Sequence, residues 1–481
     1  MRRPAGLLVT SGLRRRFDRS LPNGRGFVTE TQRADIPAAQ PGLADRSGVG
    51  RLLSALRRIL LPLFPHGPRP VRRTRRQAVL RTAATVAVLA AGAWVSLIRQ
   101  AGTPSWQTVW SEDAWLFLPR AVHGPGAALF RQYAGYLQLV PQLIADGVAR
   151  LPLRDASVGF AIAGALVASS MAIFVFHASR GHIRQPALRA LLSCSVLLLP
   201  TALIEIANNG VDSPWYLMFG FFWALLWRPR SAGGKAVVAL IAFAAMSSQV
   251  ANLLFLPMVA ARVIALPRLR EHAVTVGWLA GIGFQSIELF DAAKGHPLGP
   301  ASGAIHFYGQ HVLVPVVFGW RWALQVQAAI GIAATIAIAG GVLAAVVAWA
   351  LWRGNRQNRA FTVAALTMGV ILSIFLVMYR HLIGTEASSD LWVPGGRYAT
   401  MGILLLDCIA IAGVGAYLRR KSTVQHLARR AIAIALLVAG LGTGWATSFR
   451  YHNVRSKNPP WSKTYIGYQQ QVLDHPNSLN G

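Results

Sequence analysis

Two adjacent carboxylates, Glu112 and Asp113, have the clearest chemical potential in this sequence. They lie in the segment SWQTVWSEDAWLFLPRAV at residues 105–122, shortly after the first long apolar run. Paired carboxylates can take a proton from an attacking hydroxyl group, or hold a divalent cation such as Mg²⁺ or Mn²⁺ against a phosphate. A structural interpretation is equally open, because Ser111 is a good N-cap and acidic residues in a first helical turn complement the helix dipole. Both interpretations can hold at once.

Three arginines near this pair, or on the same predicted side of the membrane, could bind a phosphate group. Arg120 and Arg131 follow the acidic pair, and Arg397 stands where the last long outer loop enters an apolar run. A guanidinium group binds phosphate oxygens through a planar fork. The alternative for Arg397 is snorkelling to the membrane interface. The preceding Gly395-Gly396 permits an unusual backbone turn, which favours a shaped site.

Other side chains could contact a sugar. Asn208 and Asn209 lie in IEIANNGVDSPWYL at residues 204–217, and their amides could bind sugar hydroxyls. The Gly, Asp and Pro that follow them also match a turn, and we favour the turn. Tyr133 and Tyr136 could stack on a sugar ring, although anchoring at the membrane interface is the alternative that we favour.

Several common chemistries lack support in the sequence. There is no phosphate-binding Walker loop, dinucleotide fingerprint or serine nucleophile elbow. The spacing of His306 and His311 in HFYGQH does not suit a zinc site on one helical face. Asp407 lies inside an apolar run, where an ionisable residue is a functional candidate, although it could also bond a neighbouring helix. The sequence therefore does not indicate a nucleotide-linked substrate.

The elements that must position these residues are membrane-spanning helices. Of the 481 residues, 54% are hydrophobic and 14% are charged, whereas soluble domains carry about 25% charged residues. Long apolar runs without alternation predict helices rather than a barrel. The composition therefore predicts an all-α, polytopic bundle of about eleven spans, with short amphipathic helices in the first outer loop at Glu112–Val122 and Tyr136–Leu151. The predicted spans are Ala78–Ile98, Ser157–His177, Leu188–Ile204, Trp215–Trp227, Lys235–Ser248, Asn252–Leu266, Ala273–Phe290, Ala323–Trp352, Ala360–Tyr379, Tyr398–Leu418 and Ala431–Ser448.

The charge distribution predicts the orientation. The net charge is +31, and its basic residues cluster in residues 1–77 and in alternate loops, as the positive-inside rule requires. This pattern favours membrane insertion over nucleic-acid binding. We expect a cytoplasmic, largely disordered tail at 1–77, a transmembrane domain at 78–448 and a short extracytoplasmic tail at 449–481. Within the first tail, Arg51–Leu63 could form an amphipathic helix on anionic lipid. The expected location is the plasma membrane.

An acidic pair just after the first span, in a basic-tailed protein with about eleven spans, resembles the GT-C class of membrane glycosyltransferases. The segments AGYLQLVPQLIA (134–145), IEIANNGVDSPWYL (204–217) and VPGGRY (393–398) also look like bacterial proteins of this broad type. The resemblance covers residues 78–450 as architecture. It implies a polyprenyl-phosphate sugar donor used on the outer face. The chain departs from the class in lacking a sizeable soluble domain after the last span.

The resemblance assigns roles to these residues. Asp113, helped by Glu112, would be the base or the ligand of a divalent cation, and Arg397, with Arg120 or Arg131, would bind the donor phosphate. The acceptor would be a glycan or lipid of the cell envelope. Two other hypotheses stay open: a transporter or flippase of lipid-linked glycans, which should carry a midplane cavity, and a non-catalytic membrane scaffold.

Overall fold

The computed structural model describes residues 48–67, 74–124, 126–203, 205–289, 298–380, 396–419, 425–450, 452–453 and 455–470. The chain divides into Met1–Arg51 and Leu52–Gly481, and the fold presented below is that of the second unit. Its described residues form helices and no strand, apart from one isolated bridge between Tyr133 and Tyr136. The predicted all-helical class is confirmed for this part of the chain.

The helices follow one another with short 3₁₀ or π-helical segments (η) between them. The ones that position the site are η4 (Asp113–Phe117), η8 (Pro200–Leu203), η9 (Val250–Phe255) and η13 (Gly396–Ala399). The α-helices are α1 (Gly48–Leu60), α2 (Arg75–Leu97), α3 (Leu118–His123), α4 (Leu139–Val148), α5 (Ala156–Ala178), α6 (Pro186–Leu197), α7 (Ser213–Leu226), α8 (Ala232–Ser248), α9 (Leu256–Ala265), α10 (Ala273–Leu289), α11 (Ala301–Phe307), α12 (Val314–Phe318), α13 (Trp320–Ile330), α14 (Ile332–Arg353), α15 (Arg356–Tyr379), α16 (Thr400–Leu418), α17 (Gln425–Ser448) and α18 (Trp461–Tyr468).

Six helical segments among the described residues are long and apolar enough to cross a membrane, whereas the sequence predicts eleven spans. Each predicted span does contain helix, but several helices are short, and α7 has 14 residues. At 1.5 Å per residue this is about 21 Å, less than the ~30 Å hydrocarbon core. The six segments are Arg75–Leu97, Leu153–Gly181, Ile332–Arg353, Arg356–Tyr379, Gly396–Leu418 and Leu427–Ser448.

The structure differs from the sequence prediction at two neighbouring elements, one predicted span and one predicted loop. The predicted span Ala323–Trp352 is divided between α13 and α14 at Gly331, whose φ of +84° is a left-handed conformation that favours glycine. The predicted loop Asp291–Trp322 is largely helical, because residues 301–318 form α11, a π-helical segment and α12. The pair Ala301–Phe318 and Trp322–Ile330 bends by 115° and would raise the candidate spans to seven if it counts as one.

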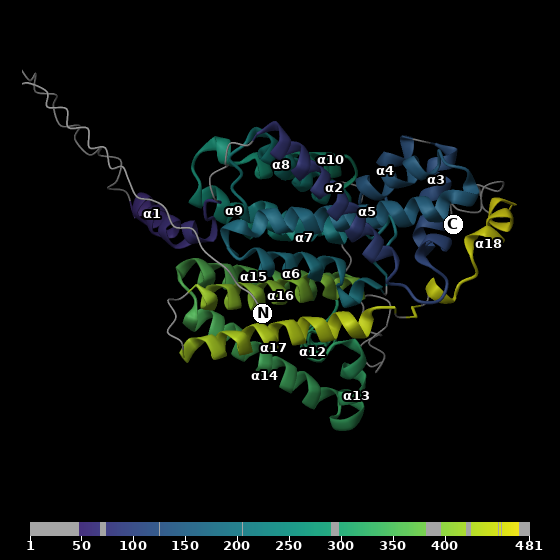
Figure 1. Cartoon of the computed structure of the whole chain (residues 1–481). Helices are drawn as coiled ribbons and strands as arrows, with labels where there is room; N and C mark the ends of the chain where they lie inside the picture. Colours follow the sequence, from purple (N-terminus) through teal and green to yellow (C-terminus); the bar gives the residue numbers. More distant parts are fainter. Residues whose placement is uncertain are drawn as a thin grey trace, which may run out of the picture. The chain divides into compact units, whose positions relative to one another are not determined.

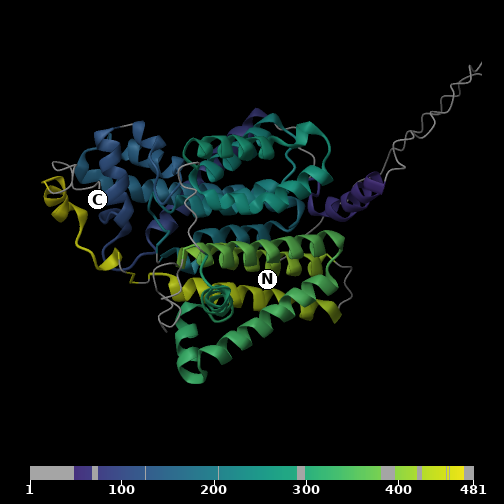
Figure 2. The same cartoon turned by 180° about the vertical axis from the view of Figure 1, so that it is seen from behind.

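Two helices, α7 and α16, are buried among the others, and outer helices such as α2 expose apolar side chains. Every residue of α7 is buried, as is most of α16. Figures 1 and 2 show α14, α15, α16 and α17 on one side of α6 and α7, with α8 and α10 on the other. On α2 the apolar side chains of Val86, Val88 and Trp94 are more than half exposed. Such extended apolar surface is unfavourable in water, so it indicates a membrane-embedded helical protein.

The predicted disordered tail at 1–77 contains ordered structure near its end. Residues 48–60 form α1, where the sequence suggested an amphipathic helix at Arg51–Leu63. The side chain of Thr74 caps α2 by accepting a hydrogen bond from the Gln77 backbone N–H, and the Gln77 side-chain oxygen accepts the Thr74 backbone N–H in return. This capping box fixes where the first spanning helix begins. The rest of the predicted tail, residues 1–47 and 68–73, lies outside the described residues.

Candidate active site

Three carboxylates surround Arg397, one from Glu112 and two from the loop before α7, and we call these four residues the Arg397 cluster. Nη1 of Arg397 lies 3.3 Å from Oδ1 of Asp212 and 3.9 Å from Oε1 of Glu112. Its Nε lies 3.8 Å from Oε2 of Glu205, which also accepts the Arg397 backbone N–H at 3.2 Å. The guanidinium group is therefore held in one orientation by charges on three sides.

The loop that carries Glu205 and Asp212 is fixed by its own asparagines. Asn208 has a φ of +59°, a left-handed conformation that Asn tolerates better than most residues. Its side-chain amide donates to the Ser96 backbone at 2.9 Å and accepts from the Ser96 hydroxyl at 2.7 Å. Oδ1 of Asn209 accepts the backbone N–H of Asp212 at 2.9 Å. Both amides are buried and bonded within the protein, which favours the predicted turn over sugar binding.

Asp113 holds the same loop from another direction. Its carboxylate oxygens accept the backbone N–H groups of Gly210 at 2.8 Å and Val211 at 2.9 Å, and the side chain is fully buried. Burial raises the pKa of Asp113 to about 7, although the backbone bonds and the charge of Arg455 act in the opposite direction. These bonds give Asp113 a structural role, and its place in a first helical turn agrees with the alternative that the sequence offered. Its role as base or metal ligand stays a prediction.

Replacing Asp113 by Asn should therefore destabilise the protein. The amide NH₂ would face a backbone N–H donor where an oxygen stands now, leaving that donor unsatisfied at a cost of about 1–3 kcal/mol. The midpoint of thermal unfolding should fall, and activity should fall with it. Asp155→Asn, on an exposed side chain, is the matched control. An Asp113→Asn protein that is inactive but fully stable would support the catalytic hypothesis.

Arg455, which the sequence analysis did not single out, completes the support of the loop. Its buried guanidinium group donates to the backbone oxygens of Asn208 at 2.9 Å and Ser105 at 2.8 Å, and to the Thr108 hydroxyl at 2.7 Å. Burial lowers its pKa to about 10. The predicted C-terminal tail is thus part of the site's framework, and α18 adds a hydrogen bond of 2.6 Å from the Tyr468 hydroxyl to the Ala114 backbone.

A cavity of about 250 Å³ lies beside the Arg397 cluster, and we call it the Arg380 cavity. Arg380, at the end of α15, is exposed and donates from Nε to the Tyr398 hydroxyl at 3.1 Å. The volume is slightly below the ~300–1,000 Å³ typical of ligand pockets, so it suits a single ring or headgroup. Its lining residues are Tyr133, Tyr136, Gln138, Val211, Asp212, Pro214, Trp215, Gln249, Val250, Ala251, Leu253, Leu254, Phe375, Leu376, Tyr379, Arg380, Arg397 and Tyr398.

Two tyrosines that line this cavity bond neighbouring side chains, one of them the acidic Glu112. The Tyr133 hydroxyl donates to Oε1 of Glu112 at 3.4 Å, and the Tyr136 hydroxyl donates to Oε1 of Gln249 at 2.6 Å. Burial, and then the charge of Glu112, raise the pKa of Tyr133 to about 12. Burial also raises the pKa of Tyr136. Both groups therefore stay neutral and act as hydrogen-bond donors at neutral pH.

The structure separates the three arginines that the sequence grouped as phosphate ligands. Arg397 lines the cavity. Arg120 instead donates to the Gln132 backbone at 3.0 Å, and Arg131 is exposed on the loop. Arg380 also lines the cavity, and the sequence analysis did not single it out. One signal could have found it: a basic residue at the predicted outer end of a span runs against the positive-inside rule, so it needs another reason to be there.

The described carboxylates do not suit a resident divalent cation. Asp113 is occupied by backbone amides, and Glu112, Glu205 and Asp212 are turned toward Arg397. Within the described ranges, no group of three or more His, Cys, Asp or Glu side chains is placed to hold a metal ion. His311 is buried and stacks on Phe307 with ring centroids 4.3 Å apart. We therefore derive no step through Mg²⁺ or Mn²⁺.

No protein-family model matches this chain, and neither a curated protein nor a solved structure is significantly similar to it. The function must therefore be argued from the arrangement of the described residues.

Proposed function

We propose that the protein is a membrane glycosyltransferase that takes a sugar from a polyprenyl-phosphate carrier, with a cell-envelope glycan or lipid as acceptor. The observation that carries the proposal is that two residues of the Arg397 cluster, Asp212 and Arg397, line the Arg380 cavity. One cavity thereby contains a guanidinium group suited to a phosphate, on Arg380, and tyrosine hydroxyl groups suited to a sugar, and it is lined by one carboxylate of the acidic cluster, that of Asp212. The resemblance to the GT-C class agrees with this combination.

Within this proposal Arg380, rather than Arg397, contacts the donor phosphate. Arg397 already faces three carboxylates at 3.3–3.9 Å, so its charge is outweighed and a further anion beside it would be repelled. Arg380 lines the cavity and is exposed. Arg397 instead positions the acidic groups.

Glu112 is the proposed general base. Its side chain is 14% exposed, against 8% for Glu205 and 3% for Asp212, so an acceptor reaches it most easily. The acceptor oxygen attacks the anomeric carbon while its hydroxyl proton passes to Glu112. The bond from that carbon to the phosphate oxygen breaks, and polyprenyl phosphate leaves with the electron pair. An attack from the face opposite the leaving group inverts the anomeric configuration.

The rate of transfer should fall on acidification through about pH 7. Burial raises the pKa of Asp212 to about 7, although Arg397 beside it acts in the opposite direction. As the pH falls below this value the carboxyl takes up its proton, and its ion pair with Arg397 is lost. Initial rates measured from about pH 5 to 9 should show this fall in the wild type and a smaller fall in Asp212→Asn, whose rate is already lowered at high pH. Asp113 has a similar pKa and titrates in both proteins, so a variant whose rate depends on pH in the same way as the wild type would contradict the assignment.

The proposal is tested by incubating membranes that contain the protein with a panel of radiolabelled polyprenyl-phosphate sugars. Transfer predicts that label leaves the carrier and that free polyprenyl phosphate accumulates, in excess of membranes without the protein. If no donor in the panel is consumed when membrane acceptors are supplied, the proposal fails.

A second candidate function is movement of a lipid-linked glycan across the membrane. Asp407 stands near the middle of α16 on the wall of a groove, and carboxylates within membrane helices often belong to transport pathways. The same assay separates the two functions, because transport leaves the bond between sugar and carrier intact.

A further inference from the structure

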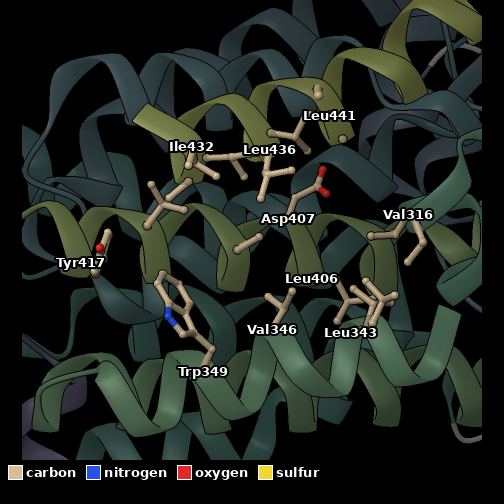
Figure 3. Close-up of a pocket in the computed structure, with 18 of the residues that line it drawn as sticks. Val316, Leu343, Val346, Trp349, Leu406, Asp407, Tyr417, Ile432, Leu436 and Leu441 are labelled. Atoms are coloured by element: carbon tan, nitrogen blue, oxygen red, sulfur yellow. The ribbon is translucent and has the colours of Figure 1, made fainter. Parts of the chain in front are cut away.

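A large groove lies between α14, α16 and α17, apart from the Arg380 cavity. Its volume is about 1010 Å³. Figure 3 shows Trp349 of α14, Asp407 of α16 and Leu436 of α17 around it. Leu436 is 69% exposed and Ile432 is 57% exposed, so the groove opens sideways to whatever surrounds these helices. In a bilayer the surroundings are lipid.

The basic residues of the groove gather at one end. Arg353 ends α14, and Arg429 and Arg430 lie near the start of α17; all three line the groove. This is the end that the sequence predicts to be cytoplasmic. From Arg430 to Thr443 the groove follows 13 residues of α17, which is about 20 Å of helix. That length is about two-thirds of the ~30 Å hydrocarbon core.

Asp407 is the one carboxylate among the described residues that line the groove. Ten residues of α16, about 15 Å of helix, separate it from Tyr417, which also lines the groove, close to the C-terminal end of α16. Figure 3 shows Asp407 and Tyr417 well apart along this helix. Asp407 therefore lies beside the apolar part of the groove and does not neutralise the arginines.

We propose that this groove binds a membrane lipid with an anionic phosphate headgroup. The guanidinium groups of Arg353, Arg429 and Arg430 would hold the phosphate oxygens, because planar forks and positive charge both suit them. The aliphatic walls would hold the hydrocarbon tail along the 20 Å of α17. The two sources of such a lipid are an anionic phospholipid and a polyprenyl phosphate. The inference goes beyond the proposed transfer reaction and does not depend on it.

The test measures lipid retained by the full-length protein in native mass spectrometry. Detergent-purified protein is mixed with phosphatidylglycerol, polyprenyl phosphate or zwitterionic phosphatidylcholine, one at a time. We expect one or both anionic lipids to be retained in preference to phosphatidylcholine, and the preferred one identifies the source. The double variant Arg429→Gln/Arg430→Gln should reduce this retention about 30-fold, from a typical contribution per basic residue at a membrane surface. Arg268→Gln/Arg270→Gln, in another predicted cytoplasmic loop, is the charge-matched control and should retain lipid normally.

A second pair of variants tests the groove without changing charge. Gly440 lines the groove, and a Cβ there would meet no atom within 4 Å, so the side chain of Gly440→Trp can start from this position and occupy the groove. Gly442 on the same helix has equal room, but it is not among the lining residues. Gly440→Trp should lower anionic-lipid retention, and Gly442→Trp should not. Three results would overturn the proposal. One is retention of phosphatidylcholine as strong as that of the anionic lipids, and another is full retention of anionic lipid by the double arginine variant. The third is an equal loss of anionic-lipid retention in both tryptophan variants.

Discussion

Replacing Glu112 by Gln should lower the rate of sugar transfer by about 10²–10⁴-fold, the usual contribution of a general base. Glutamine keeps the size of the side chain and an oxygen that can accept the 3.4 Å hydrogen bond from Tyr133. It cannot take a proton from the acceptor. The Glu112 side chain is 14% exposed, and its ion pair with Arg397 is long, at 3.9 Å. The fold should therefore tolerate the loss of its charge. The measurement is the initial rate with a radiolabelled polyprenyl-phosphate sugar, together with the unfolding midpoint.

The matched control for this variant is Glu271→Gln. Glu271 forms an ion pair of 2.8 Å with Arg228 and lies in a loop predicted to be cytoplasmic. The Glu271→Gln variant should transfer sugar at the wild-type rate. If Glu112→Gln transfers sugar as fast as the wild type, the general base is another group and the proposed roles in the Arg397 cluster are wrong.

Replacing Arg397 by Met should destabilise the protein by about 3–5 kcal/mol, the typical cost of removing one partner from a buried ion pair. Glu112, Glu205 and Asp212 would then face one another without the cation that lies 3.3–3.9 Å from them. Transfer should also be lost, because Arg397 holds the general base in place. Thermal unfolding of the purified protein can be followed by the fluorescence of its 15 tryptophans.

A double-mutant cycle separates charge from packing in this prediction. Arg397→Met combined with Asp212→Asn removes one of the carboxylates that the single variant leaves unpaired. The double variant should therefore unfold at a higher temperature than Arg397→Met alone. If the two effects on stability simply add, the ion pair of 3.3 Å contributes little, and Arg397 acts mainly by filling space.

The outlines of the fold follow from the sequence because they depend on local properties. Apolar runs and capping residues such as Thr74 predict where helices lie. The number of complete spans does not follow, since the buried α7 is as apolar as a spanning helix but has only 14 residues. Apolar composition alone does not tell burial by protein from burial in lipid.

The site was predictable only in part, because its partners are distant in the chain. Glu112 and Asp113 are neighbours, yet one faces Arg397 and the other bonds the backbone of Gly210, 97 residues away. No local pattern distinguishes the two carboxylates. By contrast, Arg380 and Arg455 break the positive-inside pattern, and this departure could have marked both for a role beyond orientation.

The most direct test of the account is whether the Arg380 cavity faces the cell exterior and accepts the donor. Tyr379 lines this cavity and is 38% exposed, so Tyr379→Cys places a thiol at its edge. In intact cells a membrane-impermeant maleimide should label this variant and not the wild type, whose two cysteines lie within α6 and α16. In purified protein a polyprenyl-phosphate sugar should protect the thiol. Labelling only after the cells are permeabilised, or no protection by any such donor, would contradict the account.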